Sequence, residues 1–301
     1  MTIAIKNSAF SVFSLILMFV GLVVTQLPQS SSVSADEKMT AQQVIARHIE
    51  AVGQKESRES IKTRVLSGSC KFIVRNGSGG ELQGPAVLAS DGKKMLVGIN
   101  FGNTAYPAEQ FGYDGQKLTT GYITPGRRSA LGDFLLSENV ILREGLLGGV
   151  LSSAWPLFDE ALNSNLVEYG GLKKIGGRQS HEIRYSPKRG SDSQIKLFFD
   201  AENFNHIRSE YKRLISAQMR SNPESSTTNQ RETCYSLTED FGEFKKEAGL
   251  MLPHSYKIQL SVEGTGSTYL SEWSLNFNRF QFNQKIPAES FTIATAASQE
   301  K

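Results

Sequence analysis

The stretch TRVLSGSCKFIVRNGSGGELQGPAVLASDGKKMLVGINFG, residues 63–102, alternates apolar and polar residues over most of its length. A period of two is typical of strands, because successive side chains on a strand point to opposite faces. The alternation is interrupted at Asn76-Gly77, Gly79-Gly80 and Asp91-Gly92, pairs that favour the positive φ angles of tight hairpin turns. The stretch therefore predicts antiparallel strands joined by short connections.

The same pattern returns in two later blocks. Residues 165–214 predict four strands, with turns at Gly176-Gly177, near 188–191 and at 200–203, and residues 233–283 predict three or four more. Together the blocks give roughly ten or eleven strands. A sheet of that size curls into an incomplete barrel, and helices cover its concave side. The predicted fold class is mainly β (α+β), a single large antiparallel sheet curled in this way, with an N-terminal helix and a helical insertion.

Residues 38–53, KMTAQQVIARHIEAVG, carry the signals of one amphipathic helix. Thr40 is placed to cap its N-terminus, and Gly53 follows its last turn. We expect His48 to be a core side chain rather than a ligand, because it falls on the apolar side. That side is formed by residues at helical spacing, which are Val44, Ile45, His48, Ile49 and Val52.

The segment at about 129–160 is unusually rich in leucine for a chain that otherwise predicts strands. Its apolar residues cluster three to four apart, which predicts two short helical pieces rather than a strand. We expect the hinge between them at Gly145 or Gly148-Gly149, and the end before Pro156. The segment must therefore lie against the sheet as an insertion.

Residues 1–35 have the pattern of a secretory signal peptide. Lys6 precedes an apolar run over 9–24, and the small residues Val33-Ser34-Ala35 predict cleavage after Ala35. The alternative is an uncleaved membrane anchor, because the run approaches the length that spans a bilayer. The expected location is the periplasm or cell envelope.

The residues after the leader, 36–301, are predicted to form one half-barrel domain that includes the insertion. The chain has two cysteines, Cys70 and Cys234, in a compartment that permits a disulfide. Even spacing of Cys70 with Leu66 predicts a buried thiol on a strand face. Pairing of the two cysteines stays open, because the sequence does not place their Cα atoms within bonding distance.

Composition and motifs favour a binding protein over an enzyme. The formal net charge of +3 comes without the clustered basic surface of a nucleic-acid binder. The four histidines fall on separate predicted elements, so no metal site is expected. The chain lacks a nucleophile elbow, a P-loop and a dinucleotide-binding glycine motif, and the acidic pair Glu239-Asp240 is expected to be solvated surface. We therefore expect no catalytic residue and no cofactor.

The order of these elements resembles the outer-membrane lipoprotein-sorting (LolA/LolB-like) superfamily over residues 38–293. The resemblance rests on an ordered series of turn and strand signatures: IEAVG, IKTRVLSGSCKF, GYDG, GGRQSHEIRYSPKRG, LFFDAENF, GLMLPHSYKI and IPAESFTI. It implies an incomplete antiparallel barrel with a helical lid over an apolar cavity that accepts acyl chains. The glycine-rich 145–149 segment and the polar loop at 216–232 depart from the pattern, so no lipoprotein-transfer residue is carried over.

Under that resemblance the protein is an exported, non-enzymatic carrier or chaperone for a lipid, lipoprotein acyl chains or another hydrophobic ligand. Gly145, Gly148 and Gly149 are the predicted hinge of the lid, and Arg127 and Arg128 are predicted to meet an anionic headgroup or a partner's acidic patch. The predicted ligand contacts of the lid are Leu135, Leu136, Leu142, Leu146, Leu147, Leu151, Trp155 and Phe158.

The alternative is a fixed helical plug that completes the core of an envelope scaffold. Such a scaffold would bind a protein partner, for example one associated with the membrane, and would not need a cavity. Lid and plug require the same leucines, because both bury the segment against the sheet.

Overall fold

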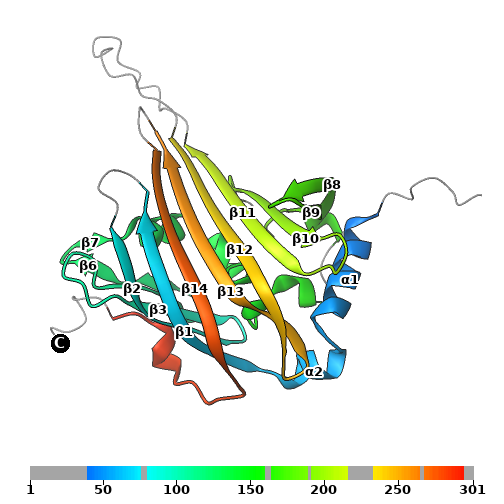
Figure 1. Ribbon diagram of the computed structural model, residues 1–301, viewed down its shortest axis with the longest axis horizontal. Coiled ribbons are helices and arrows are strands. Elements are labelled where there is room, and N and C mark those ends of the chain that lie inside the picture. Colours follow the sequence, from blue (N-terminus) through cyan, green and yellow to red (C-terminus); the bar gives the residue numbers. More distant parts are fainter. Residues whose placement is uncertain are drawn as a thin grey trace, which may run out of the picture. The chain divides into compact units, whose positions relative to one another are not determined.

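The computed structural model describes residues 39–75, 80–159, 164–188, 191–215, 233–264 and 268–294. Twelve strands form one antiparallel sheet in the order β5-β4-β3-β2-β1-β14-β13-β12-β11-β10-β9-β8 (Figure 1). A separate two-stranded hairpin consists of β6 (Tyr122–Thr124) and β7 (Arg127–Arg128). The strands of the large sheet are β1 (Thr63–Val74), β2 (Glu81–Asp91), β3 (Lys94–Asn100), β4 (Ala108–Tyr113), β5 (Leu118–Thr120), β8 (Val167–Ile175), β9 (Arg178–Tyr185), β10 (Gln194–Asp200), β11 (His206–Ile215), β12 (Thr233–Glu247), β13 (Leu250–Glu263) and β14 (Thr268–Phe282).

The predicted fold class is confirmed: among the described strands the edges β5 and β8 do not pair, so the barrel stays incomplete. The large sheet has more strands than the ten or eleven expected. The predicted turns at Asp91-Gly92 and Gly176-Gly177 are confirmed, with φ of +54°, +55° and +89° at their glycines. The predicted turn at Asn76-Gly77 and the predicted leader at 1–35 lie outside the described residues.

The first and the last strand of the large sheet, β1 and β14, lie side by side in its middle. β1 pairs with β14 along almost its whole length, with Cys70 opposite Leu275 and an irregularity between Ser67 and Gly68. A Cβ at Gly68 would lie 1.9 Å from the carbonyl oxygen of Asn276, so only glycine fits this close approach. Every other neighbouring pair in the large sheet is formed by strands that are consecutive in that sheet along the sequence.

The N-terminal helix forms as predicted. It is α1 (Ala41–Val52), and Thr40 caps it through a capping box with Gln43. Its buried face packs on β13 and β8. A short helix, α2 (Lys55–Ser60), follows and leads into β1. The apolar face of α1 thus anchors the segment that precedes β1 on the sheet.

The central segment is broken more often than the two pieces expected. It contains α3 (Ala130–Ser137), α4 (Val140–Arg143) and two 3-10 turns, η1 (Gly149–Leu151) and η2 (Pro156–Phe158). The cause lies in its glycines, since Gly145, Gly148 and Gly149 all have positive φ, between +50° and +77°. A left-handed residue ends a helix, so each glycine turns the chain instead of extending it. Whether any of the three acts as a hinge stays a prediction.

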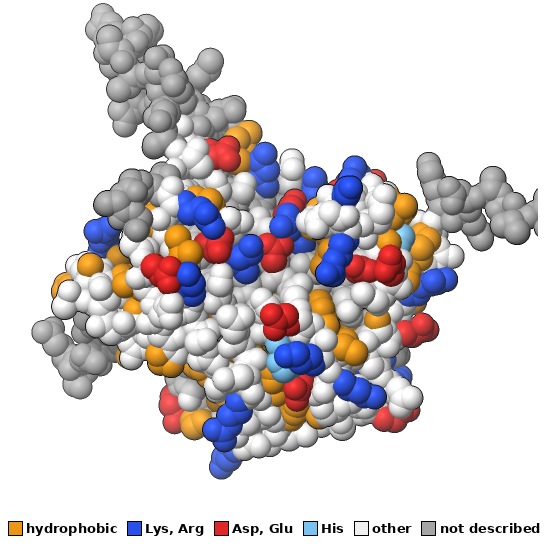
Figure 2. All heavy atoms as spheres, in the orientation of Figure 1, with side chains coloured by type: hydrophobic (Ala, Val, Ile, Leu, Met, Phe, Trp, Pro, Cys, Tyr) orange, Lys and Arg blue, Asp and Glu red, His pale blue; other side chains and the backbone are white. Residues whose placement is uncertain are grey.

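The central segment lies on one side of the sheet, behind it in Figure 1, and its leucines join the core there. The opposite face of the sheet is polar. Figure 2 shows it turned to the viewer, with charges of both signs and some hydrophobic side chains scattered over a surface that is mostly uncharged polar side chains and backbone. Along β13, Ser255, Lys257, Gln259 and Ser261 alternate with buried residues in this way. Any apolar site on the sheet itself must therefore face the central segment.

Both cysteine thiols are free, so the possible disulfide is not formed. Cys70 is buried, as its spacing predicted, and burial near Glu109 raises the pKa of its thiol to about 12. Among the described residues, no helix is both long and apolar enough to cross a membrane.

Candidate functional site

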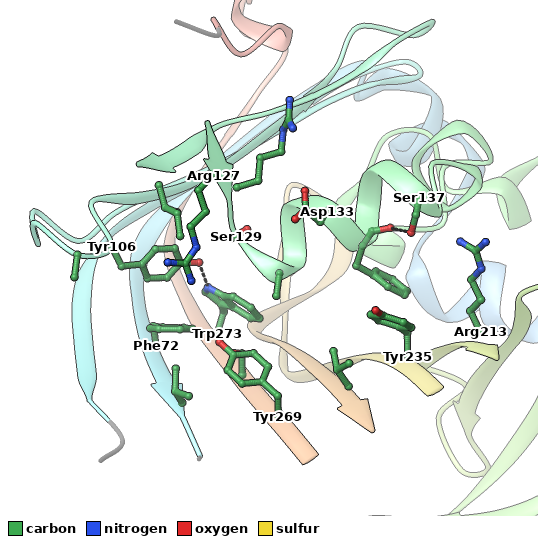
Figure 3. Close-up of a pocket in the computed structure, with 18 residues that line it drawn as sticks. Phe72, Tyr106, Arg127, Ser129, Asp133, Ser137, Arg213, Tyr235, Tyr269 and Trp273 are labelled. Atoms are coloured by element: carbon green, nitrogen blue, oxygen red, sulfur yellow. Dashed lines mark hydrogen bonds between the residues drawn. The ribbon is translucent and has the colours of Figure 1, made fainter. Parts of the chain in front are cut away.

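An open groove of about 730 Å³ lies between the sheet and the cover formed by α3 with the β6–β7 hairpin. Its volume falls in the range of small-molecule sites. The apolar lining comes from β1, β12, β13 and β14 on one side and from the cover and the 105–106 loop on the other. These residues are Phe72, Val74, Ala105, Tyr106, Ile123, Ala130, Phe134, Tyr235, Val262, Tyr269 and Trp273. Figure 3 shows ten of the lining residues by name.

Aromatic rings form one end of the groove. Phe72 on β1 stands opposite Trp273 on β14 in the sheet register, and their ring centroids are 5.1 Å apart. Tyr106 lies 4.8 Å from Phe72, and its hydroxyl accepts a hydrogen bond of 3.3 Å from the Trp273 indole (Figure 3). Such cross-strand aromatic pairs are rigid and apolar, so they form a firm surface for a hydrophobic ligand.

The other end is closed by a contact across the groove. Phe134 of α3 stacks on Tyr235 of β12, with ring centroids 6.3 Å apart. Beside them Arg213 is ion-paired with Glu138. This contact fixes the distance between α3 and the sheet, so the groove has a defined width.

A buried carboxylate ties the aromatic end to the cover. Glu109 accepts hydrogen bonds from the hydroxyls of Tyr106 and of Ser129, the latter at 2.8 Å. The Ser129 oxygen in turn accepts the Gly132 amide at 2.8 Å, which caps α3. Burial raises the pKa of Glu109 to about 7, although the two hydroxyls oppose the shift. The ionisation state of Glu109 thus bears on both walls of the groove.

Two arginines, Arg127 and Arg128, lie where the groove opens to solvent, which we call its mouth. Arg127 is exposed, and the Arg128 guanidinium lies 4.4 Å from the Tyr122 ring centroid while donating a hydrogen bond of 2.8 Å to the Tyr122 hydroxyl. Asp133 is the acidic residue of the lining. Both arginines were singled out from the sequence, and the structure brings them to the groove. Their contact with a headgroup or a partner stays a prediction.

The predicted lid leucines lie elsewhere. Leu136 is half-buried, and the others, Leu135, Leu142, Leu146, Leu147 and Leu151, are at most 3% exposed. None of these described leucines lines the groove. They fill the concave side next to it, which is the packing that the plug alternative predicts. Their role as ligand contacts stays a prediction, since a moving lid would first have to expose them.

Trp155 and Phe158 border a different and more polar hollow of about 680 Å³. The Trp155 indole donates a hydrogen bond of 3.1 Å to His48 of α1 and stacks on His206 of β11 at 4.7 Å. His48 is fully buried, as the sequence predicted for a core side chain, and burial lowers its pKa to about 4. Trp155 is thus a structural anchor in this conformation, and its ligand contact stays a prediction.

The expectation for Glu239-Asp240 was wrong for Glu239. Its carboxylate is fully buried and accepts hydrogen bonds from Tyr256, Tyr211 and the Gly148 amide at 2.5 to 2.7 Å. Adjacent strand residues do point to opposite faces, but Glu239 is the one that points inward. Burial raises its pKa to about 7. Glu239 holds the turn at Gly148 against the sheet.

The aromatic residues of the groove were missed by sequence reasoning. Phe72 belongs to the same apolar strand face as Cys70, but its partners Tyr106 and Trp273 are distant in sequence. The register of β1 with β14 is what joins them. Among the described residues no group of three or more histidine, cysteine or acidic side chains could hold a metal ion.

No protein-family model matches the sequence, and no curated protein is similar to it in sequence. Among solved structures, a LolA superfamily protein from Nitrosomonas europaea is 12% identical, with 85% of this chain and 99% of that chain covered and a TM-score of 0.42. A putative outer membrane lipoprotein-sorting protein domain from Vibrio parahaemolyticus is 11% identical (82% and 95% covered, TM-score 0.35). The Pseudomonas aeruginosa MucA/MucB complex matches at 8% identity (80% and 99% covered, TM-score 0.21). The first two matches are to proteins of the kind that the sequence resembles, and the likeness is one of fold alone.

Proposed function

We propose that the chain is an exported, non-enzymatic protein that binds the hydrophobic part of a lipid, a lipoprotein acyl chain or a similar ligand in the groove beneath α3. The groove itself carries the proposal, since it joins a rigid aromatic end to aliphatic side chains and stays open to solvent. Burying an alkyl chain in such a surface stabilises the complex by about 0.8 kcal/mol per CH₂. A ligand thus gains affinity through its chain length. The location in the periplasm or cell envelope rests on the predicted leader.

We thus place the ligand in the groove, beside the leucines of the central segment that the sequence predicted as its contacts. The cover, α3 with the β6–β7 hairpin, would lie over the ligand, whereas the leucines from Leu142 to Leu151 support the sheet from the same side. Ligand entry then requires no exposure of those leucines. Opening of the cover would be set by the Phe134–Tyr235 contact.

The experiment that tests the proposal is native mass spectrometry of the protein purified from an exporting host without harsh detergent, followed by organic extraction. We expect a stoichiometric lipid or acylated peptide to co-purify, or to bind when lipids are added afterwards. An unchanged apo mass after incubation with lipids would contradict the proposal.

A variant ties the result to the groove. Ala130 is exposed and lines the groove, so Ala130→Trp should fill part of it and reduce bound ligand at least about tenfold, the loss of a few buried methylenes. Thr124→Trp is the matched control, because Thr124 is exposed on the same cover but does not line the groove. Equal retention of ligand by both variants would place binding elsewhere.

The second candidate is an envelope scaffold that binds a protein partner. The observation in its favour is the burial of the leucines Leu142, Leu146, Leu147 and Leu151, which are at most 3% exposed and join the core. On this candidate the apo mass persists with every lipid, and Ala130→Trp leaves function intact. The same two measurements therefore separate the candidates.

A further inference from the structure

If the groove binds the alkyl chain of a ligand, as proposed above, the residues at the mouth of the groove select the ligand's head group. We infer that the ligand is an amphiphile with an alkyl chain and an anionic head group, of which a long-chain fatty acid is the simplest case, and that Arg128 is the residue that selects it. The inference rests on the donors of Arg128 and on the charges around it.

Arg128 is held in place with donors to spare. A guanidinium has five N–H groups. Within the described part of the chain, one hydrogen bond is recorded for Arg128, from Nη2 to the Tyr122 hydroxyl, and its Nε is buried without a partner. The ring of Tyr122 below the guanidinium fixes its plane. The Nε lies out of reach of solvent, so an incoming carboxylate or phosphate would pair with the free N–H groups of Nη1 and Nη2.

The surrounding charges leave the mouth positive. Arg213 is already paired with Glu138, and Glu109, with a pKa raised by burial to about 7, is largely uncharged at pH 6. Among the described residues, no ion pair is recorded for Arg127 or Arg128. Asp133 is the opposing carboxylate, and it sits in the first turn of α3, where the amides of the helix N-terminus favour a negative charge. Two arginines thus face one carboxylate that the helix already stabilises.

The arrangement also disfavours other ligands. A neutral lipid could accept a hydrogen bond from Arg128, but it would not balance the charge of the guanidinium. A protein's acidic patch would reach the exposed Arg127 more readily than Arg128, which is half-buried behind it. An anionic group on a flexible chain satisfies Arg128 while its alkyl part enters the groove beside Phe72 and Trp273.

The test is calorimetric titration of the protein, freed of co-purified lipid, with decanoate and with 1-decanol at pH 6, where Glu109 is largely protonated. We expect decanoate to bind about tenfold more tightly, the size of one charge-assisted hydrogen bond. Arg128→Gln should remove that preference, so that decanoate and 1-decanol bind the variant with affinities within about twofold of each other. Arg127→Gln, an exposed neighbour, should reduce the preference by less.

The outcomes separate the inference from the function on which it rests. If neither compound binds, the proposed function fails. If both bind equally to the wild-type protein, the function stands and the inference is overturned. A preference that survives Arg128→Gln would remove the assignment of Arg128, provided that the variant keeps its decanol affinity and melting temperature. Acetate should not bind at the same concentrations, and acetate binding as tight as that of decanoate would indicate an anion site without a chain.

Discussion

Two neighbouring regions of the concave side are both apolar, yet one is filled and the other is open. Within residues 140–151 the chain packs its own leucines against the sheet, and each of these leucines is at most 3% exposed. The glycines between them turn the chain. Between α3 and the sheet, a groove of about 730 Å³ stays open between the aromatic cluster around Phe72 and the Phe134–Tyr235 contact. The leucine-rich segment, which we name the plug for its packing alone, thus fills one part of the concave side, and the groove beside it stays open.

The comparison teaches that leucine density and ligand binding need not coincide. Leucines fill space efficiently because they adapt to their neighbours, and a filled space holds no ligand. Aromatic side chains that are fixed by the sheet register and by hydroxyl partners, as Tyr106 is by Glu109, cannot collapse into the space between them. The plug is therefore expected to govern stability, and the groove to govern binding.

The largest expected effect is on the plug. Leu147→Asp places a carboxylate where the side chain is 1% exposed, so the free energy of unfolding should fall by about 4 kcal/mol. Leu172→Asp is the control, because Leu172 is 55% exposed and should change stability by less than about 0.5 kcal/mol. Urea denaturation of both variants measures the difference. Similar values would mean that the segment does not pack as a plug.

The next effect concerns the pH dependence of the groove. Glu109 has a pKa of about 7 in the folded protein, above its ordinary 4.5, so the folded state binds more protons between these values. The stability that Glu109 contributes is therefore present at acid pH and lost as the pH rises through 7. Relative to Glu109→Gln, the wild-type protein should lose roughly 2–3 kcal/mol of unfolding free energy between pH 5 and pH 8.

Urea denaturation of both proteins at the two pH values measures this loss. Glu50→Gln, at an exposed position on α1, is the matched control and should follow the wild-type curve. A curve for Glu109→Gln parallel to the wild-type curve would show that Glu109 keeps one protonation state throughout this range.

A third prediction concerns the glycines that turn the plug. Gly149 has φ of +50°, and a Cβ there would lie 2.6 Å from Nδ1 of His206. Gly92 has nearly the same φ, +54°, with nothing within 4 Å of such a Cβ. Both alanine variants bear the backbone strain, so Gly149→Ala should be less stable than Gly92→Ala by about 2 kcal/mol from the clash alone. Equal melting temperatures would show that the plug yields at this position, as a moving lid would.

The fold could be predicted further than the site. Alternation in residues 63–102 and the capping signal at Thr40 act locally, so the sheet and α1 follow from neighbouring residues. The strand count fell short because elements such as Leu118–Thr120 are too short to show a period. The inward face of Glu239 could not be predicted, because alternation separates two faces without telling which one meets the plug.

The site depends on contacts that no local pattern contains. Phe72 and Trp273 meet only after β1 has paired with β14, and Tyr106 reaches them from the connection between β3 and β4, so their sequence separation hides the groove. The two arginines were found because they directly precede the apolar segment, a local signal. The leucines drew attention by their density, although a dense apolar run predicts burial and says nothing of what it is buried against.

The smallest effect separates the two regions most directly. Val97 is fully buried in the core, whereas Val262 is half-buried and lines the groove. Val97→Ala should lower the free energy of unfolding by about 2 kcal/mol, because it leaves a cavity that the core cannot close. Val262→Ala should lower it by only about 1 kcal/mol, because solvent already reaches its side chain. The order should reverse for binding, since Val262→Ala enlarges the groove and should weaken decanol binding whereas Val97→Ala should not. If both variants lost stability and affinity in proportion, filled and open regions would respond as one core, and the groove would have no separate role.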